Sequence, residues 1–277
     1  MAASVRRRTL VSIMPHQALD RLSADSLPAG EIAALKELER RNRDLGAPEF
    51  LEMLRAERGP FHHRAEVRTL LHLLSPQSTD RVLDAGAGVG RIAMHVAPKV
   101  SQLVCVDLSP ASLWELESEA RRMSIRNIET VQADLCSLLP SLGLFDKIYS
   151  VEVLQHIPSH PQRLLAMRRM RRLLEPGGTC VISVYCWNRR NRRSDGEKEG
   201  FWGTGDRMLY GYLYSPTELG ALLEETGFRD VRLHGLSILP GRLTRYLPPS
   251  LAVIETWCSM VPALSGMGRY VVATGKR

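Results

Sequence analysis

From about residue 81 onward, short apolar runs alternate with segments whose apolar residues recur at helical spacing. This alternation predicts parallel strands joined by crossover helices. Seven strands are predicted, near residues 81–84, 102–107, 128–132, 145–151, 179–185, 230–235 and 269–274. Helices are predicted between them, near residues 89–97, 111–122, 161–174 and 216–226. The expected fold class is therefore α/β, with helices on both faces of one mostly parallel sheet.

Turn and capping residues support these boundaries. Ser215, Pro216 and Glu218 place a capping hydroxyl, a proline at the first helical position and an acid at the third, which is typical of a helix start. Gly227 then predicts a left-handed end to that helix. Residues 175–178, Glu-Pro-Gly-Gly, predict a turn between the helix that ends near 174 and the strand that begins near 179.

The segment before the sheet is predicted to be helical. Apolar stripes at helical spacing run through residues 32–45 (Ile32, Leu35, Leu38 and Leu45) and 50–54 (Phe50, Leu51 and Leu54). Residues 59–64 then lead into a helix that packs before the first strand. We expect residues 1–65 to form an N-terminal helical cap and residues 66–277 to form the main domain. A length of 277 residues and a hydrophobic content of 44% are sufficient for this organisation.

The composition indicates the cellular compartment in which the protein is expected. The five cysteines are scattered, with no Cys-x-x-Cys pair, and no histidine cluster has metal-ligand spacing, which indicates a reducing compartment and no metal site. The apolar run after Arg6, Arg7 and Arg8 is interrupted at Pro15, so it is too short for a signal sequence. No run reaches the roughly 20 apolar residues of a transmembrane helix. A soluble, cytoplasmic protein is therefore expected.

The net charge of +7 is concentrated in two arginine clusters. One lies on the helix predicted at 161–174 and contains Arg163, Arg168, Arg169, Arg171 and Arg172. We expect this cluster to form a solvated helix face. The other lies in a polar loop and contains Arg189, Arg190, Arg192 and Arg193. This loop is either ordinary surface or a contact for an anionic partner such as nucleic acid.

A glycine-rich segment follows the first predicted strand. Residues 81–91, Arg-Val-Leu-Asp-Ala-Gly-Ala-Gly-Val-Gly-Arg, combine a buried strand, an acid at its carboxyl end and three alternating glycines that let the backbone approach a ligand. A dinucleotide fingerprint would require glycine where Arg91 stands. The acid also suits a cationic ligand better than a pyrophosphate. A nucleotide-dependent oxidoreductase is therefore disfavoured.

The segment resembles the first motif of class I S-adenosylmethionine (SAM) methyltransferases, and the resemblance extends over about 81–235 and the last strand. It implies a Rossmann-like, seven-stranded sheet with an antiparallel final strand, and SAM as cofactor. In this family Asp107, at the end of the second strand, would accept the ribose hydroxyls, and Asp134 would accept the adenine amine. Arg64 would meet the cofactor carboxylate, by analogy with other N-terminal caps. The implied cofactor contacts are Asp84, Gly86, Ala87, Gly88, Gly90, Asp107, Leu108, Ala133, Asp134, Leu135, Val151 and Arg64.

The end of the fourth strand carries the sequence Val-Glu-Val-Leu-Gln-His at 151–156. It lacks the Asn/Asp-Pro-Pro-aromatic motif of nucleic-acid amino-methyltransferases and the Pro-Cys of cytosine C5 enzymes. It resembles instead the branch of quinone-biosynthesis, small-molecule and tRNA wobble-uridine methyltransferases. His156 is the candidate general base, since a near-neutral imidazole can take a proton from an attacking hydroxyl or ammonium. The alternative is a pocket-shaping histidine, because methyl transfer depends mainly on alignment.

Two insertions are expected to form the walls of the substrate-binding pocket. Residues 186–214 are rich in aromatic residues and arginines and are interpreted as a lid, while residues 239–268 contain a predicted helix at 251–260 that either covers the acceptor or completes the core. The leading hypothesis is a SAM-dependent methyltransferase acting on oxygen or nitrogen of a small metabolite. The alternatives are an RNA-modifying methyltransferase that uses the arginine clusters, and a SAM-binding regulatory protein without turnover.

Overall fold

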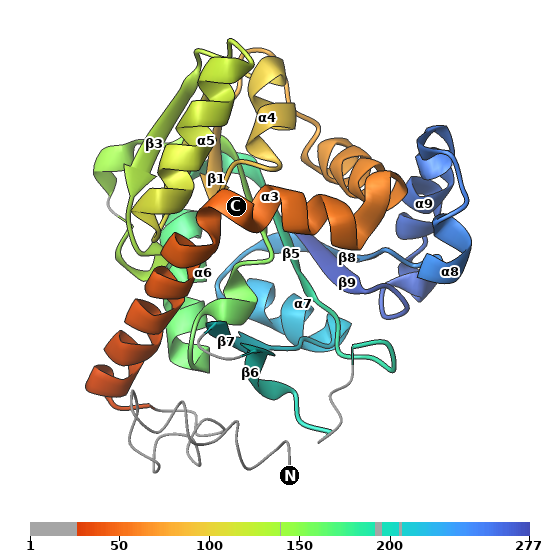
Figure 1. Cartoon of the computed structure of the whole chain (residues 1–277). Helices are drawn as coiled ribbons and strands as arrows, with labels where there is room; N and C mark the ends of the chain where they lie inside the picture. Colours follow the sequence, from red (N-terminus) through yellow and green to blue (C-terminus); the bar gives the residue numbers. More distant parts are fainter. Residues whose placement is uncertain (1–26, 139, 192–195, 205–206) are drawn as a thin grey trace.

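A seven-stranded sheet forms the centre of the molecule in a computed structural model that describes residues 27–138, 140–191, 196–204 and 207–277 (Figure 1). The strand order is β3-β2-β1-β4-β5-β9-β8. The strands are β1 (Arg81–Ala85), β2 (Gln102–Asp107), β3 (Ile128–Gln132), β4 (Phe145–Val151), β5 (Leu174–Tyr185), β8 (Arg229–Leu236) and β9 (Tyr270–Lys276). Only β9 runs antiparallel to its neighbours, β5 and β8. The expected sheet and its antiparallel final strand are confirmed.

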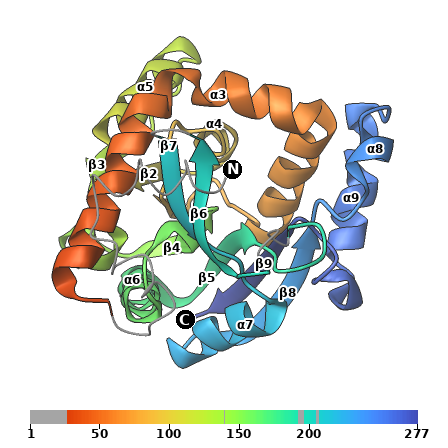
Figure 2. The ribbon, with the colours of Figure 1, turned by 60° about the horizontal axis from the view of Figure 1, so that its bottom comes forward.

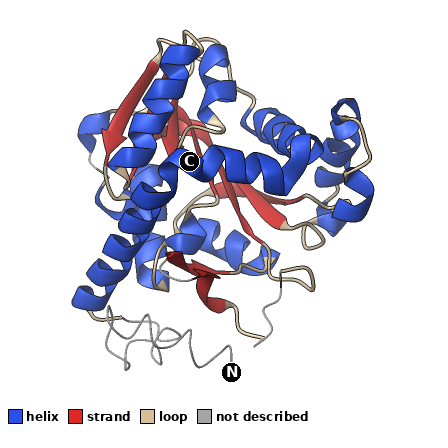
Figure 3. Ribbon diagram, viewed as in Figure 1, coloured by secondary structure: helices blue, strands red, loops and turns tan. Residues whose placement is uncertain are grey.

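Helices cover both faces of this sheet (Figure 3). On one face, α6 (His160–Leu173) and α7 (Pro216–Glu225) pack their apolar sides onto the strands. On the other face lie α4 (Ala93–Val96), α5 (Pro110–Arg122) and the end of α3 (Ala29–Leu74). Because both faces are buried, the central strands consist of nearly continuous apolar residues. That continuity explains why the sequence predicts these strands closely.

Three local boundaries differ from the prediction. The helix predicted at 89–97 shrinks to α4 and a short 3-10 turn, because Gly90 adopts a left-handed φ of +81° and Pro98 cannot continue the helix. The turn predicted at 175–178 lies inside the bounds of β5 as an irregularity, since the pairing with β4 jumps from Leu174 to Thr179. Arg163 is 5% exposed rather than solvated, whereas its neighbour Arg168 on α6 is exposed as expected.

The N-terminal cap is built on α3, which bends at Gly59 where φ is +68° (Figure 2). Residues 1–26 of the predicted cap lie outside the described residues, and the predicted boundary at 65/66 falls within the second part of α3. Leu35 and Leu38 are buried as expected. Leu45 is 61% exposed and differs from the expected stripe, whereas the polar neighbours Asn42 and Asp44 contact Met208 and Ser109.

The two insertions fold into distinct elements. The first contains a hairpin of β6 (Glu199–Thr204) and β7 (Arg207–Tyr212), which the sequence analysis did not predict. The second contains α8 (Gly241–Thr244) and α9 (Ala252–Ser259), so the helix predicted at 251–260 is confirmed. Arg192 and Arg193 lie outside the described residues. Among the residues that are described, no helix is long and apolar enough to cross a membrane.

Candidate functional site

The glycine loop after β1 has an unusual backbone. Gly86, Gly88 and Gly90 all have positive φ values, of +91°, +54° and +81°. A Cβ atom at Gly86 would lie 2.3 Å from a methyl carbon of Val153, so this position has no room for a side chain. A Cβ atom at Gly88 would meet nothing within 4 Å, and the loop is therefore open at this point. Ala87, between them, donates its N–H to the Val106 carbonyl at 3.0 Å and ties the loop to β2.

Asp107 stands at the end of β2 beside this loop. One carboxylate oxygen accepts the Gly88 N–H at 2.8 Å and the other accepts the Ser109 N–H at 2.9 Å. Burial raises the pKa of this carboxyl, while the two backbone hydrogen bonds act in the opposite direction. Leu108 follows it, half-buried. The predicted proximity of Asp107 to the glycine loop is thus present in the fold.

Asp134 follows β3 at the same edge of the sheet, between Ala133 and Leu135. The Ala133 N–H donates to the Asp107 carbonyl at 3.0 Å, which holds the two strand ends together. One Asp134 oxygen accepts the Cys136 N–H at 2.9 Å and the other receives Lys36 Nζ at 2.6 Å. The acid expected at the adenine therefore has a cationic partner from the cap.

Asp84 lies deeper than the other two acids. Its side chain is 2% exposed and accepts a hydrogen bond from the Tyr149 hydroxyl at 2.6 Å. Burial raises the pKa of Asp84 to about 7, although the Tyr149 hydrogen bond favours the ionised form. The carboxyl at the end of β1 thus changes charge near neutral pH.

The cap contributes polar side chains directly above these strand ends. Asp44 accepts a hydrogen bond from the Ser109 hydroxyl at 2.6 Å, immediately after Asp107. Arg43 is paired with Glu39 at 2.8 Å and is close enough to Asp107 to favour its ionised form. Lys36, Glu39 and Arg43 were not predicted from the sequence as residues of this site. Their helical spacing within one face of a predicted helix was the available signal.

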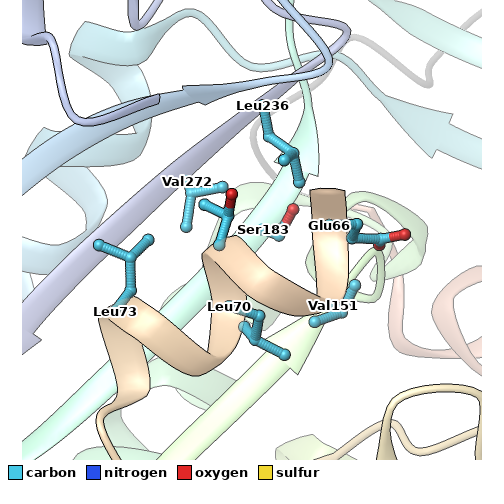
Figure 4. A pocket seen from close by; sticks show the side chains of 8 residues that line it. Glu66, Leu70, Leu73, Val151, Ser183, Leu236 and Val272 are labelled. Atoms are coloured by element: carbon cyan, nitrogen blue, oxygen red, sulfur yellow. The ribbon is translucent and has the colours of Figure 1, made fainter. Parts of the chain in front are cut away.

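A second group of charges borders the glycine loop. Arg91 forms a two-pronged ion pair with Glu66 of α3, and its guanidinium lies 3.5 Å from Glu152 at the end of β4. Glu152 has a left-handed φ of +61°, which is uncommon outside glycine and marks a constrained strand end. Figure 4 shows Glu66 near Val151 and Ser183, which line a small cavity under α3. No sequence pattern predicted this charge group.

Arg64 does not join that group. It is an exposed residue of α3, with no side-chain hydrogen bond or ion pair to any described residue. The arginine that α3 engages near the glycine loop is Arg91, through Glu66. The expectation for Arg64 therefore receives no support from this geometry.

His156 ends a 3-10 turn after β4 and is held by the lid. Its Nδ1 donates to the Tyr210 carbonyl of β7 at 2.7 Å, so the proton of the neutral ring sits on Nδ1. Burial lowers the pKa of this imidazole, although Glu39 at 3.9 Å opposes the shift. The neutral ring presents an unprotonated Nε2, which lies 3.4 Å from the Gln155 amide nitrogen.

The cap and the lid also pack on each other. Leu27, Leu35 and Tyr210 form an apolar cluster that joins α3 to β7. The Asn42 side chain donates to the Met208 carbonyl at 2.6 Å across the same contact. Arg163 donates to the Tyr210 hydroxyl at 3.1 Å and supports the hairpin from α6. The cap and the hairpin β6–β7 are thus in direct contact with each other.

Within the described parts of the chain, no three His, Cys, Asp or Glu side chains gather in a way that could hold a metal ion. The charged cluster therefore consists of acids, with lysine and arginine partners, around an open glycine loop. Such a set suits a ligand with hydroxyl and amine donors and a positive charge better than a phosphate.

Comparison with known proteins places this site in a family. A family model described as a methyltransferase domain matches residues 61–233. A ubiquinone biosynthesis O-methyltransferase of Xanthomonas campestris pv. campestris is 32% identical over 131 residues, covering 41% of this chain and 51% of that protein. A 23S rRNA (uracil(1939)-C(5))-methyltransferase of Chromohalobacter salexigens is 36% identical over 80 residues, covering 29% of this chain and 17% of that protein. The chain therefore spans about half or less of these relatives.

A solved structure also shares the fold. It is the 1,6-didemethyltoxoflavin N1-methyltransferase of Burkholderia thailandensis with bound 1,6-didemethyltoxoflavin and S-adenosylhomocysteine. The TM-score is 0.57 at 20% identity, covering 91% of each chain. At this identity the likeness concerns the fold alone.

Proposed function

Because the chain belongs to the methyltransferase domain family, we propose that it transfers a methyl group from SAM to an oxygen or nitrogen of a small-molecule acceptor. The observation that carries this proposal is the arrangement at one edge of the sheet. Three successive strand ends carry Asp84, Asp107 and Asp134 around a glycine loop with an open side. Ligands of open α/β sheets bind at this carboxyl edge.

The residues present fit SAM. The room beside Gly88 admits a ligand close to the backbone, and Asp107 would accept the ribose hydroxyls there. Asp134 would face the adenine amine, and Asp84 would lie toward the charged amino-acid part. A buried oxygen of Glu39, Oε2, has no hydrogen-bond partner among the described residues and is available to a ligand donor. SAM supplies an electrophilic methyl group on a positively charged sulfur.

The protein's own residues would position the acceptor and the lid during methyl transfer. The cap and the lid pack on each other beside the carboxyl edge, and alignment of the acceptor there would contribute most of the rate enhancement. His156 anchors the lid through the Tyr210 carbonyl and keeps Nε2 unprotonated. We infer that its main role is to position the lid, and that any proton transfer is secondary.

The alternatives predict different products. An RNA-modifying enzyme would use the arginine clusters, of which Arg163 is buried beneath the lid while Arg168 and Arg189 are exposed, so it would place label in RNA. A regulatory SAM binder would bind cofactor without turnover.

A test of the proposal follows methyl transfer in a metabolite extract. The full chain is incubated with methyl-labelled SAM and the extract, and labelled products are found by mass spectrometry. A labelled small molecule that disappears when Asp107→Ala replaces the wild type is the expected result. Label confined to RNA, or cofactor binding with no labelled product, would contradict the proposal.

A further inference from the structure

A larger cavity, of about 770 Å³, opens at the same carboxyl edge beyond β5 and β9. One wall is the bend of α3 at Gly59–His62, and the opposite wall is the start of the second insertion from Leu239 to Leu247. Arg190 and Asn191 of the first insertion and Arg269 and Tyr270 close the remaining side. This volume lies within the roughly 300–1,000 Å³ typical of small-ligand sites.

Four arginines line this cavity, and they give it a strong positive charge. They are Arg190, Arg242, Arg245 and Arg269. None of the four forms an ion pair with a carboxylate of the described residues. Arg190 donates to the Ser237 carbonyl at 2.8 Å, and Arg269 lies over the Tyr185 and Tyr270 rings. These contacts orient two guanidinium groups and leave their charges uncompensated.

Among the described residues that line the cavity, Glu66 is the only one with a carboxylate, and its charge is already matched by Arg91. Arg91 directly follows Gly90 of the cofactor loop and lies 3.5 Å from Glu152 at the end of β4. Glu66 therefore belongs both to the cavity wall and to the charge group that borders the glycine loop. The cavity thus adjoins the proposed cofactor site.

Apolar side chains form another part of the lining. Phe61 and the partly buried Leu239 and Leu247 belong to both the cavity wall and a small apolar cluster with Ala65 and Ala252. This cluster gives a ligand an apolar surface beside the guanidinium groups.

We propose that this cavity receives the methyl acceptor, and that its arginines hold a carboxylate or phosphate group of that acceptor while the apolar wall contacts its body. The proposal rests on the proposed methyl transfer and adds the chemical class of the substrate. Guanidinium groups pair with both kinds of anion through charge-assisted hydrogen bonds. The anionic group would hold one end of the acceptor while its nucleophile points toward the glycine loop.

The test uses the isotope-labelled full chain saturated with S-adenosylhomocysteine, titrated with citrate and, separately, with pyrophosphate. Amide chemical shifts give both the dissociation constant and the location of binding. The cavity variant is Arg242→Gln/Arg245→Gln, because neither side chain makes a hydrogen bond or ion pair with the described residues. The matched control is Arg189→Gln/Arg232→Gln, which removes the same charge from exposed positions outside the lining.

The expected result is that citrate or pyrophosphate shifts amides at Ser237–Gly241 and Arg269. The cavity variant should then bind that anion at least about tenfold more weakly, while the control should change by less than about threefold. The preferred anion shows whether the acceptor carries carboxylate or phosphate. Equal weakening in both variants, or shifts confined to other surfaces, would overturn the inference. Failure of S-adenosylhomocysteine itself to bind would instead overturn the proposed function.

Discussion

Asp84 owes its chemistry to burial at the end of β1. Its pKa is about 7 in the folded protein against 3.8 for an unperturbed carboxyl. A carboxyl with a raised pKa contributes stability that is complete below the unfolded pKa and is lost as the pH rises through the folded pKa. The folded protein should therefore lose stability from this group between about pH 4 and pH 7.

Asp84→Asn tests this pH dependence. Asparagine stays neutral, so the free energy of unfolding of the variant relative to wild type should increase from pH 5 to pH 8. Urea unfolding at the two pH values measures the difference. A difference that is the same at both pH values would show that Asp84 keeps an ordinary pKa.

Asp107 is expected to hold the ribose of the cofactor. Asp107→Ala should weaken SAM binding by about 1.5–3 kcal/mol, the range for hydrogen bonds that involve a charged group. Isothermal titration calorimetry measures the change, with Glu129→Ala as the control because Glu129 is an exposed acid of the neighbouring strand β3. Unchanged affinity in Asp107→Ala would refute the ribose assignment.

Two substitutions separate the roles of His156. His156→Asn offers an amide donor near the position of Nδ1 and keeps a partner for the Tyr210 carbonyl, whereas His156→Ala leaves that carbonyl without one. If the residue positions the lid, turnover should survive largely in the asparagine variant and fall in the alanine variant. Similar, severe loss of turnover in both variants would identify a general base.

At the scale of elements, the start of helix α7 can be predicted from its capping residues. Ser215 and Glu218 form a complete capping box at the start of α7. Ser215→Ala should lower the free energy of unfolding by about 1 kcal/mol, since the cap satisfies an otherwise free backbone N–H. Chemical denaturation measures this, with exposed Ser137→Ala as the reference substitution. Equal stability of the two variants would mean that the cap contributes little.

The hairpin of the lid and the contacts of the cap could not be predicted from the sequence. The hairpin β6–β7 contains Gly200, Gly203 and Gly211, and glycine has a low strand propensity, so the sequence pattern does not predict strands here. The strands form because the two segments pair with each other. The contact of Lys36 with Asp134 joins residues far apart in the sequence and exists only because α3 crosses the sheet edge. In contrast, the strands of the central sheet and the acids at their ends follow from local patterns. Tertiary contacts therefore account for most of what the sequence did not predict.

At the scale of the whole molecule, the cap and the lid form one cover, because α3 and β7 share an apolar cluster and the Asn42 hydrogen bond. Binding of S-adenosylhomocysteine should therefore slow amide hydrogen exchange in both α3 and β6–β7, in addition to the glycine loop. Hydrogen exchange followed by mass spectrometry measures this, and Asn42→Ala should reduce the protection of the hairpin. Protection restricted to the glycine loop would show that the cover moves independently of the cofactor.

The antiparallel strand β9 lies between β5 and β8, and β8 has no other partner in the sheet. During synthesis β8 leaves the ribosome well before β9, so it stays an unpaired strand until the later segment emerges. The part of the sheet from β3 to β5 can assemble earlier from segments already made. A nascent chain should therefore pass through an intermediate with an exposed β5 edge, a surface on which chaperones can act before the sheet closes.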